Sequence, residues 1–212
     1  MASLLDDLPT LTALVEIARD FHRRGWMAGT AGNLSARTTT GRFCITASGK
    51  PKGRLDEGDF VEIDIATGAV AQRHEPRAQP SAEAAIHRAL YRLFPRARAC
   101  LHVHTVDATL AALAAPPDAV ELPLPSMEMV KGLGIWEQDP KVALALFDNL
   151  ADVAAIADEV EARFTAHTPR MPALMIRHHG VTVWGDGIQQ AYDRLECLEF
   201  VLGVAARASA AT

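Results

Sequence analysis

Two histidines, His102 and His104, stand at the end of an apolar run that begins at Ala99 and is typical of a buried strand. Side chains alternate across a strand, so both imidazoles point to one face while Val103 points to the other. Two imidazoles on one face are a ready pair of metal ligands. The same spacing also arises by chance, so the pair alone leaves metal binding and an ordinary pair of histidines equally open.

A second apolar run, 173–177, ends in His178 and His179, directly before Gly180. A third imidazole could therefore reach the first pair from another strand. Three nitrogens with one open position describe a catalytic zinc site rather than a structural one. Strand parity does not choose between His178 and His179, because the sequence does not say which face looks at the metal.

Three short segments are rich in small residues, whose backbone can approach an anion closely. They are Gly29 to Asn33, Ser48 with Gly49, and Ser81 with Ala82. Backbone amides, hydroxyl groups and a helix N-terminus would together suit one phosphate group, although each segment alone is more often an ordinary turn. Lys50 and Lys52 follow the second segment closely. We expect both side chains to be solvated at the surface, where they could add positive charge.

Two glutamates are candidates for proton transfer. Glu83 lies in the first turn of a predicted helix that Ser81 could cap, where the helix dipole favours a carboxylate in any case. Glu128 lies between Met127 and Met129, and partial burial among such apolar neighbours would suit it to acid–base work. A solvated loop glutamate is the alternative at that position.

Apolar periodicity predicts the elements that must position these residues. Helices are expected up to Gly25 and over about 81–94, 106–114, 140–149, 151–166 and 187–208. Strands are expected over 43–46, 61–65, 99–104, 173–178 and 181–184, with connections at 29–35 and 116–125. Two of the strand pairs have the spacing of hairpins, which favours a mixed or antiparallel sheet covered by helices.

Composition bounds the class of protein. The chain has 212 residues, 49% of them hydrophobic, and no linker-like or repeated segment divides it, so we expect one domain over residues 1–212. A net charge of −5 without a basic stripe argues against nucleic acid as a partner. Three dispersed cysteines fit a reducing cytosol, and neither a secretion signal nor a membrane span is expected.

Five segments carry, in order, a resemblance to the class II aldolase/adducin family. They are 29–35, 45–53, 81–83, 102–105 and 178–180. Two further segments, 128–137 and 177–185, resemble the methylthioribulose-1-phosphate dehydratase branch of that family, and they are more specific than the His-x-His spacing. The resemblance covers nearly the whole chain.

The resemblance implies a three-layer α/β/α fold around a central mixed, largely antiparallel sheet. It also implies a cytoplasmic homotetramer with one zinc ion per subunit, held by His102, His104 and the histidine directly before the glycine, His179. The family's phosphate-binding loops fall on Gly32, Asn33, Ser48, Gly49, Ser81 and Ala82.

The resemblance also divides the proton work between two positions. The acid/base glutamate of the aldolases falls on Glu83, whereas the base proposed for animal dehydratases falls on Glu128, and this chain has both. We expect Glu128 to remove the proton at substrate carbon C3 and to deliver a proton to the departing C4 hydroxyl. Glu83 would then orient substrate or water.

The implied reaction is the zinc-dependent dehydration of 5-methylthioribulose 1-phosphate to 2,3-diketo-5-methylthiopentyl 1-phosphate in methionine salvage. A sugar-phosphate aldolase or epimerase that acts through a zinc enediolate is the alternative. A non-catalytic, adducin-like interaction module is a second alternative, which three convergent imidazoles disfavour because a scaffold has no need of them.

Overall fold

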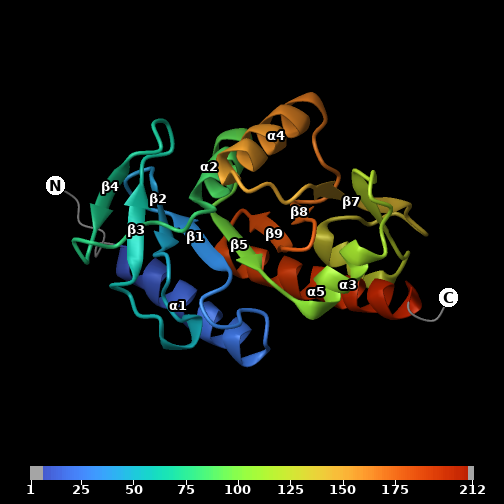
Figure 1. The fold of residues 1–212 in the computed structure, drawn as a ribbon, viewed down its shortest axis with the longest axis horizontal. Helices are drawn as coiled ribbons and strands as arrows, with labels where there is room; N and C mark the ends of the chain where they lie inside the picture. The colour runs from blue at the N-terminus through green and yellow to red at the C-terminus, as the bar shows by residue number, and fades with distance from the viewer. Residues whose placement is uncertain (1–6, 210–212) are drawn as a thin grey trace.

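The computed structural model describes residues 7–209, and its centre is one nine-stranded mixed sheet (Figure 1). Along the sheet the strands follow the order β4-β3-β2-β1-β5-β9-β8-β7-β6, and each neighbouring pair is antiparallel except β7 with β8. The strands are β1 (Asn33–Arg37), β2 (Phe43–Thr46), β3 (Phe60–Ile63), β4 (Val70–Arg73), β5 (Ala99–Val103), β6 (Glu121–Leu124), β7 (Val142–Phe147), β8 (Ala173–Ile176) and β9 (Gly180–Gly185).

Helices cover both faces of the sheet, which makes the three layers expected from the sequence (Figure 1). One face carries α1 (Leu8–Arg23), α3 (Val106–Leu113) and α5 (Ile188–Ser209), and the other carries α2 (Ala84–Leu93) and α4 (Val153–Ala166). Two short 3₁₀ segments, η2 (Lys52–Arg54) and η3 (Glu128–Leu133), pack against α1 and α5 respectively.

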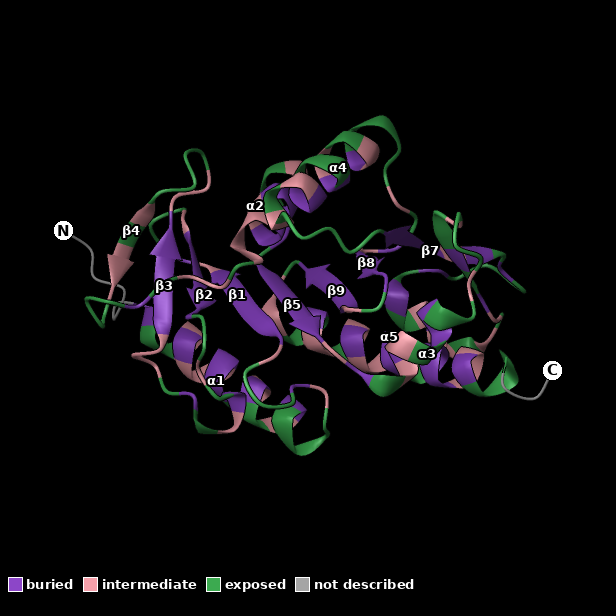
Figure 2. Ribbon diagram, in the orientation of Figure 1, coloured by how far each residue is buried: buried purple, intermediate pink, exposed green. Residues whose placement is uncertain are grey.

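Two hydrophobic cores hold the layers together, one on each face of the sheet (Figure 2). Apolar side chains recur at helical spacing on the inner face of α5. Side chains on β5 alternate between the two faces of the sheet, so Leu101 enters one core and Cys100 the other. Strands in the middle of the sheet are therefore buried on both faces, and this fixes the backbone that carries the predicted histidines.

The helix predicted over 140–149 is wrong, because Val142–Phe147 is the strand β7 and runs parallel to β8. All six of its side chains are apolar and five are buried. A strand covered on both faces shows no alternation, and its alanines and leucines are also good helix formers. Periodicity therefore could not separate a strand from a buried helix at this place.

Two predicted connections contain strands. The segment 29–35 becomes β1 from Asn33 onward, and its pairing with β5 sets Asn33 opposite His102. The Pro-rich segment 116–125 contains β6, which forms one edge of the sheet. An edge strand tolerates Pro123 because the amide hydrogen that proline lacks need not pair.

None of the helices within residues 7–209 is long and apolar enough to span a bilayer.

Candidate metal centre

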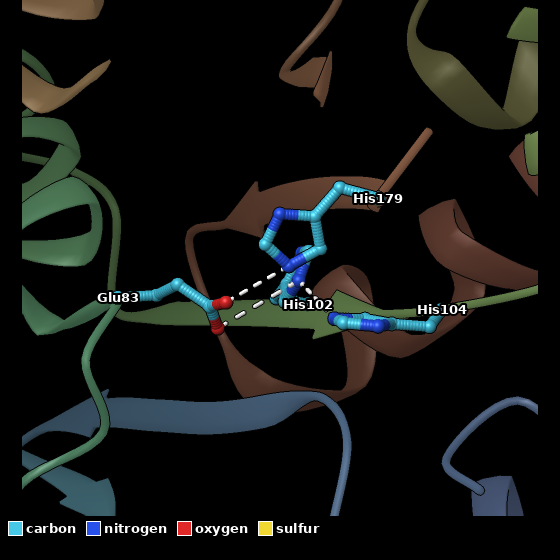
Figure 3. A group of neighbouring side chains, drawn as sticks. All are labelled: Glu83, His102, His104 and His179. Atoms are coloured by element: carbon cyan, nitrogen blue, oxygen red, sulfur yellow. Dashed lines mark hydrogen bonds and ion pairs between the residues drawn. The ribbon is translucent and has the colours of Figure 1, made fainter. Parts of the chain in front are cut away.

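Four side chains from three distant segments meet at one point of the sheet (Figure 3). His102 lies on β5 and His104 just beyond its end, His179 lies in the turn between β8 and β9, and Glu83 directly precedes α2. Each residue offers a ligand atom, and these atoms all lie within 4.8 Å of one another. We call this set the His/Glu cluster; it could hold a metal ion.

The backbone of β9 fixes the orientation of His102, which is only 1% exposed. Its Nδ1 lies 2.9 Å from the carbonyl oxygen of Val181 and 3.0 Å from Oγ1 of Thr182. A carbonyl can only accept, so Nδ1 carries the hydrogen and Nε2 keeps its lone pair for a metal. That Nε2 lies 2.9 Å from Nε2 of His104, close enough for both nitrogens to bind one ion.

The turn between β8 and β9 decides between the two neighbouring histidines. Ile176 pairs with Gly180 across the turn, and His178 takes a left-handed backbone conformation with φ of 55°. His178 is exposed as a result, while His179 faces the His/Glu cluster. A side chain on Gly180 would collide with the carbonyl of Val103, so a glycine is required for this turn to approach β5.

Glu83 occupies the cap position of α2, and its side chain reaches the histidines instead of capping the helix. Its Oε1 lies 2.9 Å from Nε2 of His179, and its Oε2 lies 3.7 Å from Nε2 of His102 and accepts a hydrogen bond from the Asn33 amide. The cap expected from Ser81 is wrong, because α2 begins at Ala84 without a side-chain cap.

Burial sets the protonation states of the cluster. Burial, reinforced by His102 and His179, lowers the pKa of His104 to about 3, and burial is also the largest influence that lowers the pKa of His102. Burial by itself would raise the pKa of Glu83, but His102 and the hydrogen bond from His179 outweigh it and hold that pKa below its usual range. Neutral imidazoles and an ionised carboxylate are the forms that bind metals.

The three small-residue segments come together beside this cluster, as the phosphate hypothesis requires. They are 29–33, 48–49 and 81–82. Ala47 and Pro80 form a β-bridge, which places the second and third segments side by side. Asn33 joins the first segment to the third through its contact with Glu83. Whether these segments bind phosphate stays a prediction.

The two lysines beside the loops differ from each other, and the surface position expected for Lys52 is wrong. Lys50 forms ion pairs with Asp59 at 2.7 Å and with Glu75 at 2.9 Å. Lys52 is only 2% exposed, because η2 packs against α1 and draws the side chain inward. Segment 49–53 alternates lysine with glycine or proline and contains no apolar periodicity, so the sequence could not reveal this burial.

Glu128 is not part of the His/Glu cluster, and of the two alternatives left open by the sequence the structure shows the solvated one. Its side chain is 82% exposed and forms an ion pair with Lys131 at 2.7 Å. The next residue, Met129, lines a hollow of about 760 Å³ together with Trp26, whose carbonyl accepts the amide hydrogen of His104. The catalytic role of Glu128 stays a prediction.

Residues 12–206 match the family described as the Class II Aldolase and Adducin N-terminal domain. The chain therefore belongs to the class II aldolase/adducin family. The solved structure of YgbL from Escherichia coli superposes on it with a TM-score of 0.76 at 26% identity, covering 92% of this chain and 87% of the other. The three-layer fold expected from the sequence is confirmed.

Two similar relatives within the family have the same description. A methylthioribulose-1-phosphate dehydratase from Microcystis aeruginosa is 49% identical over 189 residues, covering 89% of this chain and 91% of the relative. A second dehydratase of the same description, from Leptospira biflexa, is 39% identical over 208 residues, covering 96% of this chain and 99% of the relative. The resemblance to methylthioribulose-1-phosphate dehydratases, inferred from the segments around Glu128 and His179, is confirmed by these two relatives.

Proposed function

We propose that this chain catalyses the dehydration of 5-methylthioribulose 1-phosphate to 2,3-diketo-5-methylthiopentyl 1-phosphate, the hydro-lyase step of methionine salvage. One observation carries the proposal: 49% identity to a dehydratase of that description over 89% of this chain. The His/Glu cluster agrees with it, because removal of a proton beside a carbonyl is a reaction that a metal assists. The cytoplasm is the compartment we propose for this enzyme.

The metal we propose is zinc, one ion per subunit, with His102, His104 and His179 as ligands. The hydrogen bond from His102 Nδ1 to Val181 supports this, because it leaves Nε2 unprotonated and facing the other imidazoles. Three neutral imidazoles are a ligand set that zinc prefers, and they leave a position open for substrate. When bound, zinc would act as a Lewis acid that polarises the substrate carbonyl.

Glu128 and Glu83 have different tasks in the proposed reaction. Oε2 of Glu83 accepts a hydrogen bond from the Asn33 amide, which holds this carboxylate beside the ligand histidines. Its Oε1 would give up its contact with His179 Nε2 when that imidazole binds zinc, so Glu83 is suited to hold and orient substrate or water. Glu128 has one ion pair, with exposed Lys131, which a substrate can displace at little cost. We therefore assign the proton at C3 to Glu128.

The atoms balance in three steps. Glu128 accepts the proton of C3, and the electron pair left behind is delocalised toward the C2 carbonyl. The C4–O bond then breaks, and the departing hydroxyl takes that proton from Glu128 and leaves as water. In the third step, the C3 hydroxyl of the remaining enol loses its proton and C4 gains one from solvent, which gives the second ketone at C3 of the product.

The remaining parts of the proposal concern binding and assembly. Gly32, Asn33, Ser48, Gly49, Ser81 and Ala82 would surround the substrate phosphate. Support comes from the bridge between Ala47 and Pro80, which brings two of the three segments together. We also propose that the whole chain is one class II aldolase-like domain and that it assembles as a homotetramer.

Product masses test the proposal. The zinc-loaded protein is incubated with methylthioribulose 1-phosphate and, separately, with fuculose 1-phosphate. We expect the first to lose one water and the second to remain intact. Cleavage of fuculose 1-phosphate into two fragments, with methylthioribulose 1-phosphate unchanged, would show an aldolase instead.

A further inference from the structure

Lys52 is the one buried lysine among residues 7–209, and neither its position nor its contacts are used by the mechanism above. Its Nζ donates hydrogen bonds to the carbonyl oxygens of Thr30 at 2.9 Å and of Lys50 at 3.0 Å. An ammonium group has three hydrogens to donate, so one remains for a further acceptor. The ammonium thus lies between the first and second small-residue segments.

No carboxylate in the described part of the chain forms an ion pair with Lys52, whereas Lys50, two residues away, has two such partners. A buried ammonium without an anion is unfavourable, because its water shell is lost and carbonyl dipoles replace only part of it. Burial lowers the pKa of Lys52, and only the more distant Glu83 and Asp59 act in the opposite direction. Such a charge is stabilised when an anionic ligand arrives.

The position of the ammonium indicates where that ligand would lie. Thr30, whose carbonyl accepts from Lys52, lies in the same short segment as Asn33, whose amide donates to Glu83, so the ammonium lies on the side of the loops that faces the His/Glu cluster. The loops themselves offer only neutral donors, and some of these are already committed. The amide of Ser48 donates to Gln79, for example, at 2.8 Å. A doubly charged group bound here would therefore find its charge partner in Lys52.

We propose that the Lys52 ammonium binds the phosphate group of the substrate and selects phosphorylated over unphosphorylated sugars. This inference rests on the proposed function, which gives the substrate a phosphate monoester. Such a group carries a charge of about −1.5 to −2 near neutral pH. Neutral loops give the site its shape, and the lysine supplies a point charge that a hydroxyl or amide cannot replace.

The test uses the zinc-loaded protein and inorganic phosphate as the probe, with binding followed by calorimetry. Lys52→Met removes the charge and keeps the length of the side chain, and Lys50→Met is the matched control because that lysine is paired and more exposed. We expect the parent and Lys50→Met to bind phosphate alike and Lys52→Met to bind it at least about tenfold more weakly, as loss of a charged hydrogen bond requires. Equal affinity in all three proteins would overturn the inference, and so would absence of binding by the parent.

Turnover adds a readout that a purely structural role would not move. Lys52→Met should raise KM for the phosphorylated substrate and leave KM for its dephosphorylated analogue unchanged. An equal loss on both would show that Lys52 only joins the two loops. If the variant fails to fold, Lys52→Gln replaces it. Lys52→Arg keeps the charge and should bind phosphate more tightly than Lys52→Gln, whereas equal weakening by these two variants would overturn the inference.

Failure of the proposed function would look different. The phosphate titration needs no turnover, so a protein that binds phosphate through Lys52 and yet does not dehydrate methylthioribulose 1-phosphate would contradict the reaction and leave the lysine assignment standing.

Discussion

The His/Glu cluster and the segment that carries Glu128 differ in how firmly the fold holds them. The cluster lies where the central strands β5, β8 and β9 end, and the backbone of β9 orients His102. Glu128 begins a 3₁₀ segment at the surface, where its one ion pair is to another exposed side chain. The fold therefore fixes the candidate metal ligands in advance, while the group proposed for proton transfer is free to move.

This difference separates two requirements of the proposed reaction. A metal site needs ligands that are fixed before the ion arrives, because each degree of freedom lost on binding weakens affinity. A group that takes a proton from one carbon and serves a hydroxyl on the next benefits from some freedom of position. The predictions below test whether the two regions divide the work in this way.

The largest effect is expected inside the cluster. His104→Ala should remove most of the bound zinc and lower turnover by about three orders of magnitude or more, because a ligand and the polarising ion are both lost. His178→Ala is the matched control, since that histidine is exposed and faces away. Metal analysis and circular dichroism check the two variants. Full turnover by His104→Ala, or equal zinc loss in both, would contradict the assignment.

A smaller effect is expected at the surface segment. Glu128→Gln keeps the shape of the side chain but removes its basicity, so kcat should fall by about a hundredfold while zinc stays bound. Glu137→Gln, at another exposed glutamate that pairs with Arg170, should retain parental kcat. Steady-state kinetics with metal analysis measure both. If Glu128→Gln keeps the rate of the parent, the surface segment has no part in proton transfer.

The support behind the cluster should matter less than the cluster itself. Thr182→Val removes one of the two acceptors near His102 Nδ1 and leaves the Val181 carbonyl in place. Loss of such outer contacts typically costs about tenfold or more in metal affinity, so zinc should bind about tenfold more weakly. Competition with a chelator measures this. Unchanged affinity would mean that the carbonyl alone fixes the ring.

The smallest expected effect is on how stability depends on pH, and it concerns Glu199, a buried carboxyl group on α5. Burial raises the pKa of Glu199 to about 7, although the Thr105 hydroxyl acts in the opposite direction. The folded state thus favours the protonated form, and this stability is full below the unfolded pKa near 4.5 and is lost as pH rises through 7.

Glu199→Gln should therefore unfold less easily than the parent at pH 8, by about 1 kcal/mol, and show no such advantage at pH 4. Thermal unfolding of the zinc-loaded proteins across this range measures the difference. A parent whose stability does not fall relative to the variant between pH 5 and 8 would rule out a protonated Glu199.

The sequence predicted the meeting of the histidines better than the edges of the fold. Alternation along a strand is a local rule, so the shared face of His102 and His104 followed from two residues. The choice of His179 over His178 needed the left-handed backbone of the turn, which no periodicity encodes. The strand β7 was missed because helices cover both of its faces.

The charged residues were harder to place than the histidines. Whether Lys52 is buried depends on how η2 packs against α1, a contact between segments about thirty residues apart. The exposure of Glu128 likewise follows from the packing of η3 on α5 rather than from its apolar neighbours. Burial of a charged side chain is decided by tertiary contacts, and local pattern carries little information about it.

Exchange of the substrate's C3 hydrogen with solvent deuterium tests the division of work most directly. The zinc-loaded parent, Glu128→Gln and Glu83→Gln are each mixed with methylthioribulose 1-phosphate in heavy water, and deuterium at C3 is followed by mass. We expect Glu128→Gln to lose exchange together with dehydration, while Glu83→Gln retains exchange. Rapid exchange by Glu128→Gln with none by Glu83→Gln would reverse the two roles and contradict the account.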